Sequence, residues 1–282
     1  MIYLNGEFMP IEQARIPVLD RGFIFGDGVY EVIPVYSRHP FRLAEHLQRL
    51  QDSLDGISLV NPHDNPTWKR LIQRIVELNE AEDQSVYLHI TRGPAKRDHA
   101  FPMTITPTVF IMSNPLITPP LRQVNEGVCA ITAVDNRWWR CDIKAISLLP
   151  NVLLRQQAVE AGCVETVLLR DGFMTEGAAS NIFVVANGIL LAPPKNHLIL
   201  PGITYDVVLE LARANGLPHE LREIPEYELR EAEEIWLTSS TKEVLAVTQL
   251  DDKPVGKGKP GDVFARMYWL YQDYKNQVMR SA

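Results

Sequence analysis

The chain has 282 residues, of which 46% are hydrophobic and 22% are charged, and its formal net charge is −7. This composition is ordinary for a globular protein, and the length suggests one large domain or two smaller ones. The negative charge argues against a nucleic-acid partner, because neutralising phosphates requires a basic face. We expect no membrane contact, since no apolar run approaches the roughly 18 residues that span a bilayer.

The start of the chain and its cysteines favour a cytoplasmic protein. The first residues lack a basic region followed by an apolar stretch, so we expect no signal peptide. Cys129, Cys141 and Cys163 are odd in number and far apart, which fits reduced thiols better than a disulfide framework. The histidines form no HExxH pair, and we expect no metal site.

The pattern of apolar residues predicts alternating strands and helices in the first part of the chain. Asn5-Gly6 is a hairpin signal, and Pro66-Thr67 marks the start of a helix. The expected elements are a strand and turn over residues 1–9, a strand over 29–36, helices over 42–54 and 68–79, and strands over 86–92 and 108–113.

Residues 114–120 hold three prolines and little periodicity, which predicts a stiff linker between two domains, 1–113 and 121–282. Gly162 and Gly216 are expected to end helices of the second domain, and Asp171-Gly172 is expected to form the turn between two of its strands. The mixture is of the α+β class, with hairpins rather than regular βαβ units. The expected elements are strands over 128–134, 142–145, 164–170, 181–185 and 235–239, and helices over 151–161, 206–215 and 262–277.

A glycine-rich stretch near the C-terminus, residues 256–261, matches G-x-G-x-x-G letter by letter. A dinucleotide site requires a strand before this motif and a helix that opens within it. Here a turn precedes the motif and Pro260 lies inside it, so we interpret it as a surface loop. A nicotinamide-dependent oxidoreductase remains the competing hypothesis of another class.

Lys144 lies in a mostly apolar stretch, residues 141–149, where we expect it to be well buried. In apolar surroundings the neutral amine is favoured, and this is the nucleophile of Schiff-base chemistry. The alternative is a lysine that buries its stem and extends its charged head into water. Burial alone does not decide between them.

Three further features are candidates for binding a flat, phosphorylated ligand. Glu176 lies among small residues, and a carboxylate there can hold a proton on a pyridine nitrogen. Residues 202–204 precede a predicted helix, and 238–241 form a turn rich in hydroxyls, so both can bind an anion. The alternatives are a surface acid and ordinary helix caps.

Taken together, these residues resemble the class IV (fold type IV) pyridoxal-phosphate-dependent aminotransferases. The resembling segments occur in the family's order over nearly the whole chain, which makes the match specific. They are residues 20–32, 42–49, 141–144, 175–181, 202–204 and 239–241.

The resemblance implies that Lys144 carries pyridoxal 5'-phosphate as an internal aldimine and then moves a proton between substrate and cofactor. It also implies that Glu176 pairs with the pyridine nitrogen. The phosphate would be held by a set of side-chain and backbone donors. That set is Arg49, Ile203, Thr204, Ser240 and Thr241.

Residues 90–102 resemble the D-amino-acid version of the family, in which Arg97, His99 and Tyr30 would bind the substrate α-carboxylate. A guanidinium, an imidazole and a phenol are all suitable donors. By resemblance, Arg97 and His99 serve the neighbouring subunit's site, which implies a homodimer. Without the family they would be interpreted as a solvated loop.

The sequence departs from the family at Ala178 and Ala179, where a serine-rich stretch is common, and at Ser240, which is often threonine. We expect transamination between a D-amino acid such as D-alanine and 2-oxoglutarate or pyruvate. The first alternative is a branched-chain L-amino-acid aminotransferase, followed by an (R)-amine transaminase or an aminodeoxychorismate lyase. A non-catalytic protein of the same fold is the third class of hypothesis.

Overall fold

The computed structural model describes residues 1–281, and these form two compact units. The first unit contains residues 1–116, Ile143–Leu148 and the C-terminal residues from Val278. The second contains Ile117–Asp142 and Leu149–Gln277. The division therefore differs from the expected contiguous one, because the six residues around Lys144 belong to the first unit while the chain on both sides of them belongs to the second.

In the first unit, the described strands form one antiparallel sheet in the order β2-β1-β6-β5-β3-β4. Asn5 and Gly6 both have positive φ, as the predicted hairpin requires. The strands are β1 (Ile2–Leu4), β2 (Glu7–Met9), β3 (Gly28–Tyr36), β4 (His39–Pro40), β5 (Gln84–Thr91) and β6 (Thr108–Pro115). Because β6 continues to Pro115, the expected linker is partly strand.

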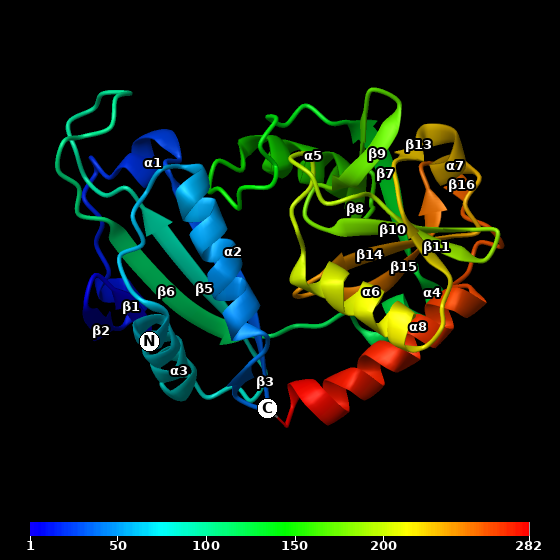
Figure 1. Ribbon diagram of the computed structural model, residues 1–282, viewed down its shortest axis with the longest axis horizontal. Coiled ribbons are helices and arrows are strands. Elements are labelled where there is room, and N and C mark those ends of the chain that lie inside the picture. The colour runs from blue at the N-terminus through cyan, green and yellow to red at the C-terminus, as the bar shows by residue number, and fades with distance from the viewer. Residues whose placement is uncertain (282) are drawn as a thin grey trace. The chain divides into compact units, whose positions relative to one another are not determined.

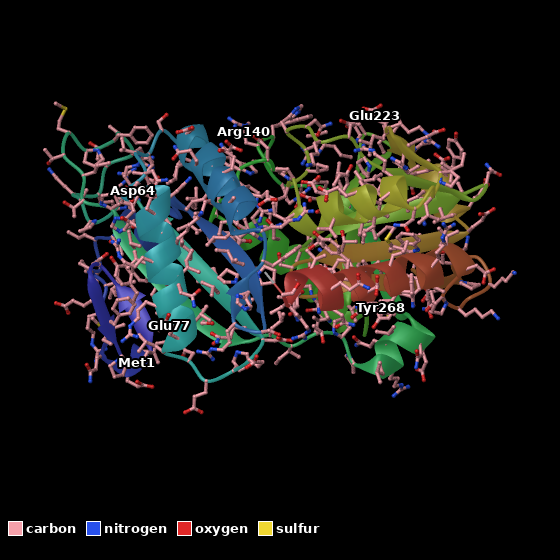
Figure 2. The ribbon with its side chains drawn as sticks, turned by 60° about the horizontal axis from the view of Figure 1, so that its bottom comes forward. Met1, Asp64, Glu77, Arg140, Glu223 and Tyr268 are labelled. Atoms are coloured by element: carbon pink, nitrogen blue, oxygen red, sulfur yellow. A yellow bond between two sulfur atoms is a disulfide. The ribbon has the colours of Figure 1, made fainter. Side chains whose placement is uncertain are left out.

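Two amphipathic helices, α2 (Leu43–Gly56) and α3 (Asn65–Glu77), pack against this sheet (Figure 1). Buried leucines of α2 and the indole of Trp68 on α3 join the strands in one core. The predicted start of α3 is wrong by a few residues: Asp64 caps it by accepting from Thr67 N, and Glu77 ends it (Figure 2). The remaining helices are η1 (Ile11–Gln13) and α1 (Arg21–Phe25).

In the second unit, the described strands form a mixed sheet in the order β12-β11-β10-β14-β15-β7-β8-β9-β13, with β16 beside β15. Three of its pairs are parallel: β11–β12, β15–β7 and β7–β8. The strands are β7 (Val128–Val134), β8 (Glu165–Arg170), β9 (Phe173–Gly177), β10 (Asn181–Ala186), β11 (Ile189–Ala192), β12 (His219–Leu221), β13 (Ile224–Pro225), β14 (Glu234–Ser239), β15 (Glu243–Leu250) and β16 (Lys253–Pro254).

Helices α6 and α8 pack against β14 and β15 of this sheet, and α5 packs against β7 and β8 (Figure 1). Gly162 follows α5 with a φ of 71°, a conformation that favours glycine at a helix end. The helices are α4 (Leu121–Glu126), α5 (Leu149–Glu160), α6 (Ile203–Ala214), α7 (Glu226–Arg230), α8 (Asp262–Tyr274) and the π-helical η2 (Lys275–Met279).

Three expectations for the second part of the chain are wrong. Residues 142–145 form no strand, only an isolated bridge between Val29 and Ala145. The Asp171-Gly172 turn joins β8 to β9, a strand that the expectation omitted, and not to β10. Helix α6 begins at Ile203 rather than at residue 206, because Gly202 is its N-cap.

The cysteine prediction is also wrong for two of the three residues. Cys129 on β7 and Cys163 just before β8 form a disulfide, with Cα atoms 4.9 Å apart. The two lie 34 residues apart in sequence but become neighbours because β7 and β8 pair in parallel. Cys141 is a free, buried cysteine.

No helix within residues 1–281 combines the length and the hydropathy of a membrane-spanning segment.

Candidate active site

The backbone of Lys144 is fastened to the first unit on two sides. Tyr30 N on β3 donates to Lys144 O at 2.9 Å, and Ile146 N donates to Gly28 O at 3.1 Å. On the other side, Lys144 N donates to Ser53 Oγ on α2 at 3.1 Å. The segment thus pairs with β3 over a few residues without forming a strand of its own. The backbone position of Lys144 is fixed by β3 and α2 together.

The side chain of Lys144 is half-buried, not well buried as the sequence suggested. Its Nζ lies 4.3 Å from the centroid of the Tyr30 ring, a cation–π distance. The Tyr30 ring in turn packs beside Tyr87 on β5, with centroids 5.7 Å apart. A half-buried amine beside an aromatic face remains accessible to a small electrophile.

Helix α2 places three polar side chains on the face that meets β3. His46, Arg49 and Ser53 follow a spacing of three and four residues, which keeps them on one side of a helix. Arg49 binds the Glu31 carboxylate with two hydrogen bonds, Nε to Oε1 at 2.7 Å and a terminal nitrogen to Oε2 at 2.8 Å. The expected phosphate-binding arginine is therefore held by a carboxylate of the neighbouring strand.

The same carboxylate also contacts His46, whose Nδ1 lies 2.8 Å from Glu31 Oε2. Burial opposes ionisation of Glu31, but Arg49 and His46 outweigh it and hold the pKa of Glu31 below its usual value. Burial lowers the pKa of His46, although Glu31 opposes that change. His46 Nε2 is buried and has no hydrogen-bond partner among the described residues.

Arg97 and His99 lie on an exposed loop of the first unit, where both approach the ring of Phe25. The Arg97 guanidinium is 5.6 Å from the Phe25 centroid, and the His99 ring is 5.3 Å from it. Arg21 fixes the loop by donating to the carbonyls of residues 98–100. Within residues 1–281 no hydrogen bond or ring contact joins either side chain to Tyr30.

Glu176, on β9 of the second unit, is a buried carboxylate and not a surface acid. Its Oε1 accepts from Arg137 at 2.5 Å, and its Oε2 accepts from Asn181 Nδ2 at 3.2 Å and Leu200 N at 3.1 Å. Burial raises the pKa of Glu176 to about 7, although Arg137 opposes that rise. The group is poised between its two protonation states near neutral pH.

Arg137 is a residue of this site that the sequence reasoning missed. Its guanidinium binds Asp135 through Nε at 2.9 Å and through a terminal nitrogen at 2.8 Å, as well as Glu176. Asp135 also accepts from Thr175 and pairs with Arg170 at 3.0 Å. The only sequence signal is an aspartate and an arginine directly after a predicted strand, at its carboxyl end.

Asn181 connects Glu176 to the two predicted anion-binding elements. Its amide donates to Glu176 and to Leu200 O, and the residue lies opposite Thr238 in the β10–β14 ladder. A Cβ on Gly202 would approach Asn181 Oδ1 to 2.0 Å, so the N-cap of α6 requires glycine here. The acid, the start of α6 and the hydroxyl-rich turn after β14 therefore meet in one place.

Both anion-binding elements have donors to offer. Among residues 1–281 no side chain caps α6, so the N–H groups of Ile203 and Thr204 have no side-chain acceptor there at the positive helix end. In the turn after β14, Ser240 is half-buried and Thr241 is exposed. The Thr238 hydroxyl is buried with no hydrogen-bond partner in the described chain. The five site residues that the sequence predicted in this unit lie on β9, at the start of α6 and in the turn after β14, and their binding roles stay predictions.

The glycine-rich residues 256–261 form a largely exposed loop between β16 and α8. Within residues 1–281, no cluster of histidine, cysteine, aspartate and glutamate has the arrangement of a metal site.

Comparison with known proteins shows the family of the chain. A family model described as amino-transferase class IV matches residues 28–250. The chain belongs to the class IV aminotransferase family. The predicted family and its fold are thereby confirmed.

Individual relatives support the same assignment. The D-alanine aminotransferase of Bacillus licheniformis is 41% identical over 260 residues, covering 92% of each chain. That of Listeria monocytogenes is 35% identical, covering 99% of this chain and 96% of the relative. Among solved structures, the branched-chain amino acid aminotransferase of Escherichia coli has a TM-score of 0.88 at 26% identity, covering 95% of this chain and 91% of that one. The branched-chain aminotransferase of Thermoproteus uzoniensis, solved with norvaline, has a TM-score of 0.85 at 25% identity, covering 96% and 93%.

Proposed function

We propose that this aminotransferase moves the amino group of a D-amino acid, with D-alanine as the first candidate, to 2-oxoglutarate or pyruvate. The observation that carries the proposal is the Lys144 amine, half-exposed, with its Nζ 4.3 Å from the Tyr30 ring centroid and its backbone fixed to β3 and α2. The D-alanine aminotransferases among its relatives support the choice of substrate.

The residues fit pyridoxal 5'-phosphate as the cofactor. Lys144 supplies the primary amine that bonds an aldehyde, and Glu176 supplies a buried carboxylate for the pyridine nitrogen. The uncapped amides of α6 and the unpartnered hydroxyl of Thr238 mark the second unit's donors for a phosphate. We propose that Arg49, Ile203, Thr204, Ser240 and Thr241 bind that phosphate.

When bound, pyridoxal phosphate supplies an electron sink for the electron pair left on the substrate Cα after its proton departs. Lys144 Nζ would take that proton from Cα and would return it at the cofactor carbon C4′, as a positioned general base and acid. Glu176, kept ionised by Arg137 and by a protonated ring nitrogen, holds the proton on that nitrogen. The two half-reactions follow a ping-pong order.

Tyr30, Arg97 and His99 are the proposed binders of the substrate α-carboxylate. All three offer N–H or O–H donors, and Arg97 and His99 sit together on the Phe25 ring, which fixes them as a pair. Within residues 1–281 neither side chain has a hydrogen bond or ring contact to Tyr30, so we propose that they serve the site of a second copy.

A homodimer is therefore part of the proposal. The loop that carries Arg97 and His99 also exposes two large apolar side chains, Phe101 at 58% and Met103 at 101%. Neighbouring exposed apolar side chains are typical of a surface that another protein chain covers. A mixture of Lys144→Ala and Arg97→Ala chains tests it, because a mixed dimer of two inactive variants contains one intact site. Random pairing then restores about a quarter of the wild-type activity, and no recovery would refute action across the interface. We place the enzyme in the cytoplasm, a location that microscopy of a tagged chain checks.

The second candidate is transamination of branched-chain L-amino acids, which the solved structures of branched-chain enzymes favour. The test is an initial-rate assay with 2-oxoglutarate and either D-alanine or L-leucine. We expect kcat/KM for D-alanine to exceed that for L-leucine by at least about a hundredfold, a preference that requires about 3 kcal/mol in the transition state. The reverse preference would assign the chain to the second candidate.

A further inference from the structure

The turn that carries Ser240 and Thr241 is short and internally fixed. Ser239 on β14 pairs with Glu243 on β15, so only three residues connect the strands. Lys242 N donates to Ser239 Oγ at 3.0 Å. Glu243 has a φ of 55°, a left-handed conformation that is costly for a glutamate unless its surroundings hold it.

The side chain of Lys242 fastens this turn to two other strands of the second unit. Its Nζ lies 2.8 Å from Glu165 Oε2, at the start of β8, and 2.9 Å from Ser180 Oγ, next to β10. Ser180 Oγ also donates to Glu165 Oε2 at 2.6 Å. The three polar groups close a small ring of hydrogen bonds around one carboxylate.

Glu165 makes this contact strong, because its side chain is fully buried. A buried carboxylate is costly without a cation and donors to neutralise it. The Lys242 side chain is only 23% exposed, so its ammonium remains close to that carboxylate. The ion pair therefore holds the end of the turn at one position.

A second fastening holds the other end of the turn. Glu243 accepts hydrogen bonds from Gln272 Nε2 and Lys275 Nζ, both at 2.7 Å, and α8 and η2 supply these donors. The turn is thus held through Lys242 by Glu165 on β8 and by Ser180 just before β10, and through Glu243 by the C-terminal helices.

We propose that Lys242 is a positioning residue of the phosphate site, whose ion pair with Glu165 holds the Ser240–Thr241 turn in the conformation that binds a phosphate monoester. The proposal rests on the function proposed above. Lys242 does not bind the phosphate itself, because its ammonium is directed to Glu165 and Ser180. A hydrogen bond to phosphate weakens steeply when the donor moves by a few tenths of an ångström, so a loose turn loses affinity.

This role predicts an effect confined to the phosphate group. Pyridoxal has the aldehyde and the ring of pyridoxal phosphate but no phosphate. Loss of Lys242 should therefore weaken binding of pyridoxal phosphate and leave binding of pyridoxal unchanged. A merely structural role would change both ligands alike.

The experiment measures the dissociation constants of pyridoxal phosphate and pyridoxal for Lys242→Met by visible absorption, with kcat measured at saturating cofactor. We expect the constant for pyridoxal phosphate to rise at least about tenfold, and the constant for pyridoxal and kcat to stay within about twofold. Lys242→Arg should restore much of the affinity, because it returns the cation. Lys257→Met, in the exposed loop, is the matched control and should change neither constant.

A double variant separates positioning from the burial of an unpaired charge. Lys242→Met with Glu165→Gln removes both charges, so we expect its melting temperature to recover relative to Lys242→Met. Its dissociation constant for pyridoxal phosphate should nevertheless stay above that of the wild type, because the ion pair that holds the turn is still missing. The double variant also keeps the test valid if Lys242→Met folds poorly.

Two outcomes overturn the proposal. An unchanged constant for pyridoxal phosphate in both variants refutes it, and so does an equal rise for pyridoxal. Failure of the proposed function looks different, because the wild-type chain would then bind pyridoxal phosphate no better than pyridoxal. That result would remove the phosphate site and the role of Lys242 with it.

Discussion

Each unit buries one glutamate against one arginine, yet the two carboxylates behave in opposite ways. Arg49 binds both oxygens of Glu31, and His46 adds a third contact, so the pKa of Glu31 falls. Arg137 binds only one oxygen of Glu176, and burial raises the pKa of Glu176 to about 7.

The difference lies in how many hydrogen bonds each carboxylate accepts from its arginine, two for Glu31 and one for Glu176. Arg137 also neutralises Asp135, with which it makes two further hydrogen bonds, whereas the guanidinium of Arg49 grips Glu31 with two nitrogens. A shared cation supports each carboxylate less. The comparison teaches that Glu31 is a fixed charge that supports Arg49, while Glu176 can change its charge, which suits the role proposed for it beside a pyridine nitrogen.

The largest effect, a loss of catalytic activity, is expected at Lys144, which lies in the same unit as the Glu31–Arg49 pair. Lys144→Ala should lower kcat/KM for D-alanine by about 10⁴-fold, because a covalent anchor and a proton carrier are lost together. Circular dichroism should show an unchanged fold. Activity within tenfold of wild type would contradict the role of Lys144. The catalytic interpretation of Glu31 and Glu176 would then fail as well.

Removing the fixed charge should affect stability. Glu31→Ala takes away the carboxylate that neutralises buried Arg49, and we expect the free energy of unfolding to fall by about 3–5 kcal/mol in urea denaturation. Glu31→Gln retains the shape of the side chain, so its free energy of unfolding should lie between those of Glu31→Ala and the wild type. A loss below about 1 kcal/mol would break the comparison, since the pair would then not be a strong one.

The adjustable carboxylate should appear as a pH dependence of the cofactor-free protein. The folded-state pKa of Glu176 lies near 7, above its ordinary value of 4.5. The protonated side chain therefore stabilises the folded state fully below pH 4.5, and this stabilisation is lost as the pH rises through 7. The stability of the wild type relative to Glu176→Gln should therefore fall by about 3 kcal/mol over that window. Urea unfolding at several pH values measures it, and a flat difference would contradict the raised pKa.

The smallest effect is expected for an arginine–glutamate pair that water surrounds. Arg122 and Glu126, at 2.8 Å on α4, have side chains 83% and 62% exposed. Arg122→Ala should leave the midpoint of urea unfolding unchanged within error, because solvent screens exposed pairs. A clear shift would mean that burial is not what separates the pairs.

Local patterns predicted much of the fold and of the candidate site. The apolar spacing of residues 42–54 located α2, whereas the contact of Arg49 with Glu31 on β3 came from the structure. The Asn5-Gly6 turn and Gly162 at the end of α5 follow from backbone preferences of single residues. Lys144 and Glu176 were candidates from the local sequence, and the family resemblance supplied their roles, which stay predictions.

Contacts across the chain were beyond this reasoning. Arg137 reaches Glu176 over 39 residues and Lys242 reaches Glu165 over 77, and no local spacing encodes either pair. The Cys129–Cys163 disulfide depends on the parallel pairing of β7 with β8. Lys144 is half-buried because its segment pairs with β3 through a single bridge, at Ala145, and does not enter the sheet as a strand.

The visible absorption spectrum of the purified chain, loaded with pyridoxal phosphate, tests the central claim most directly. We predict the yellow band of the bound cofactor, which D-alanine bleaches and L-leucine does not. Lys144→Ala should lack that band before substrate is added. Bleaching by L-leucine alone would move the chain to the branched-chain reaction, and a wild-type chain without the band would contradict the assigned chemistry of Lys144.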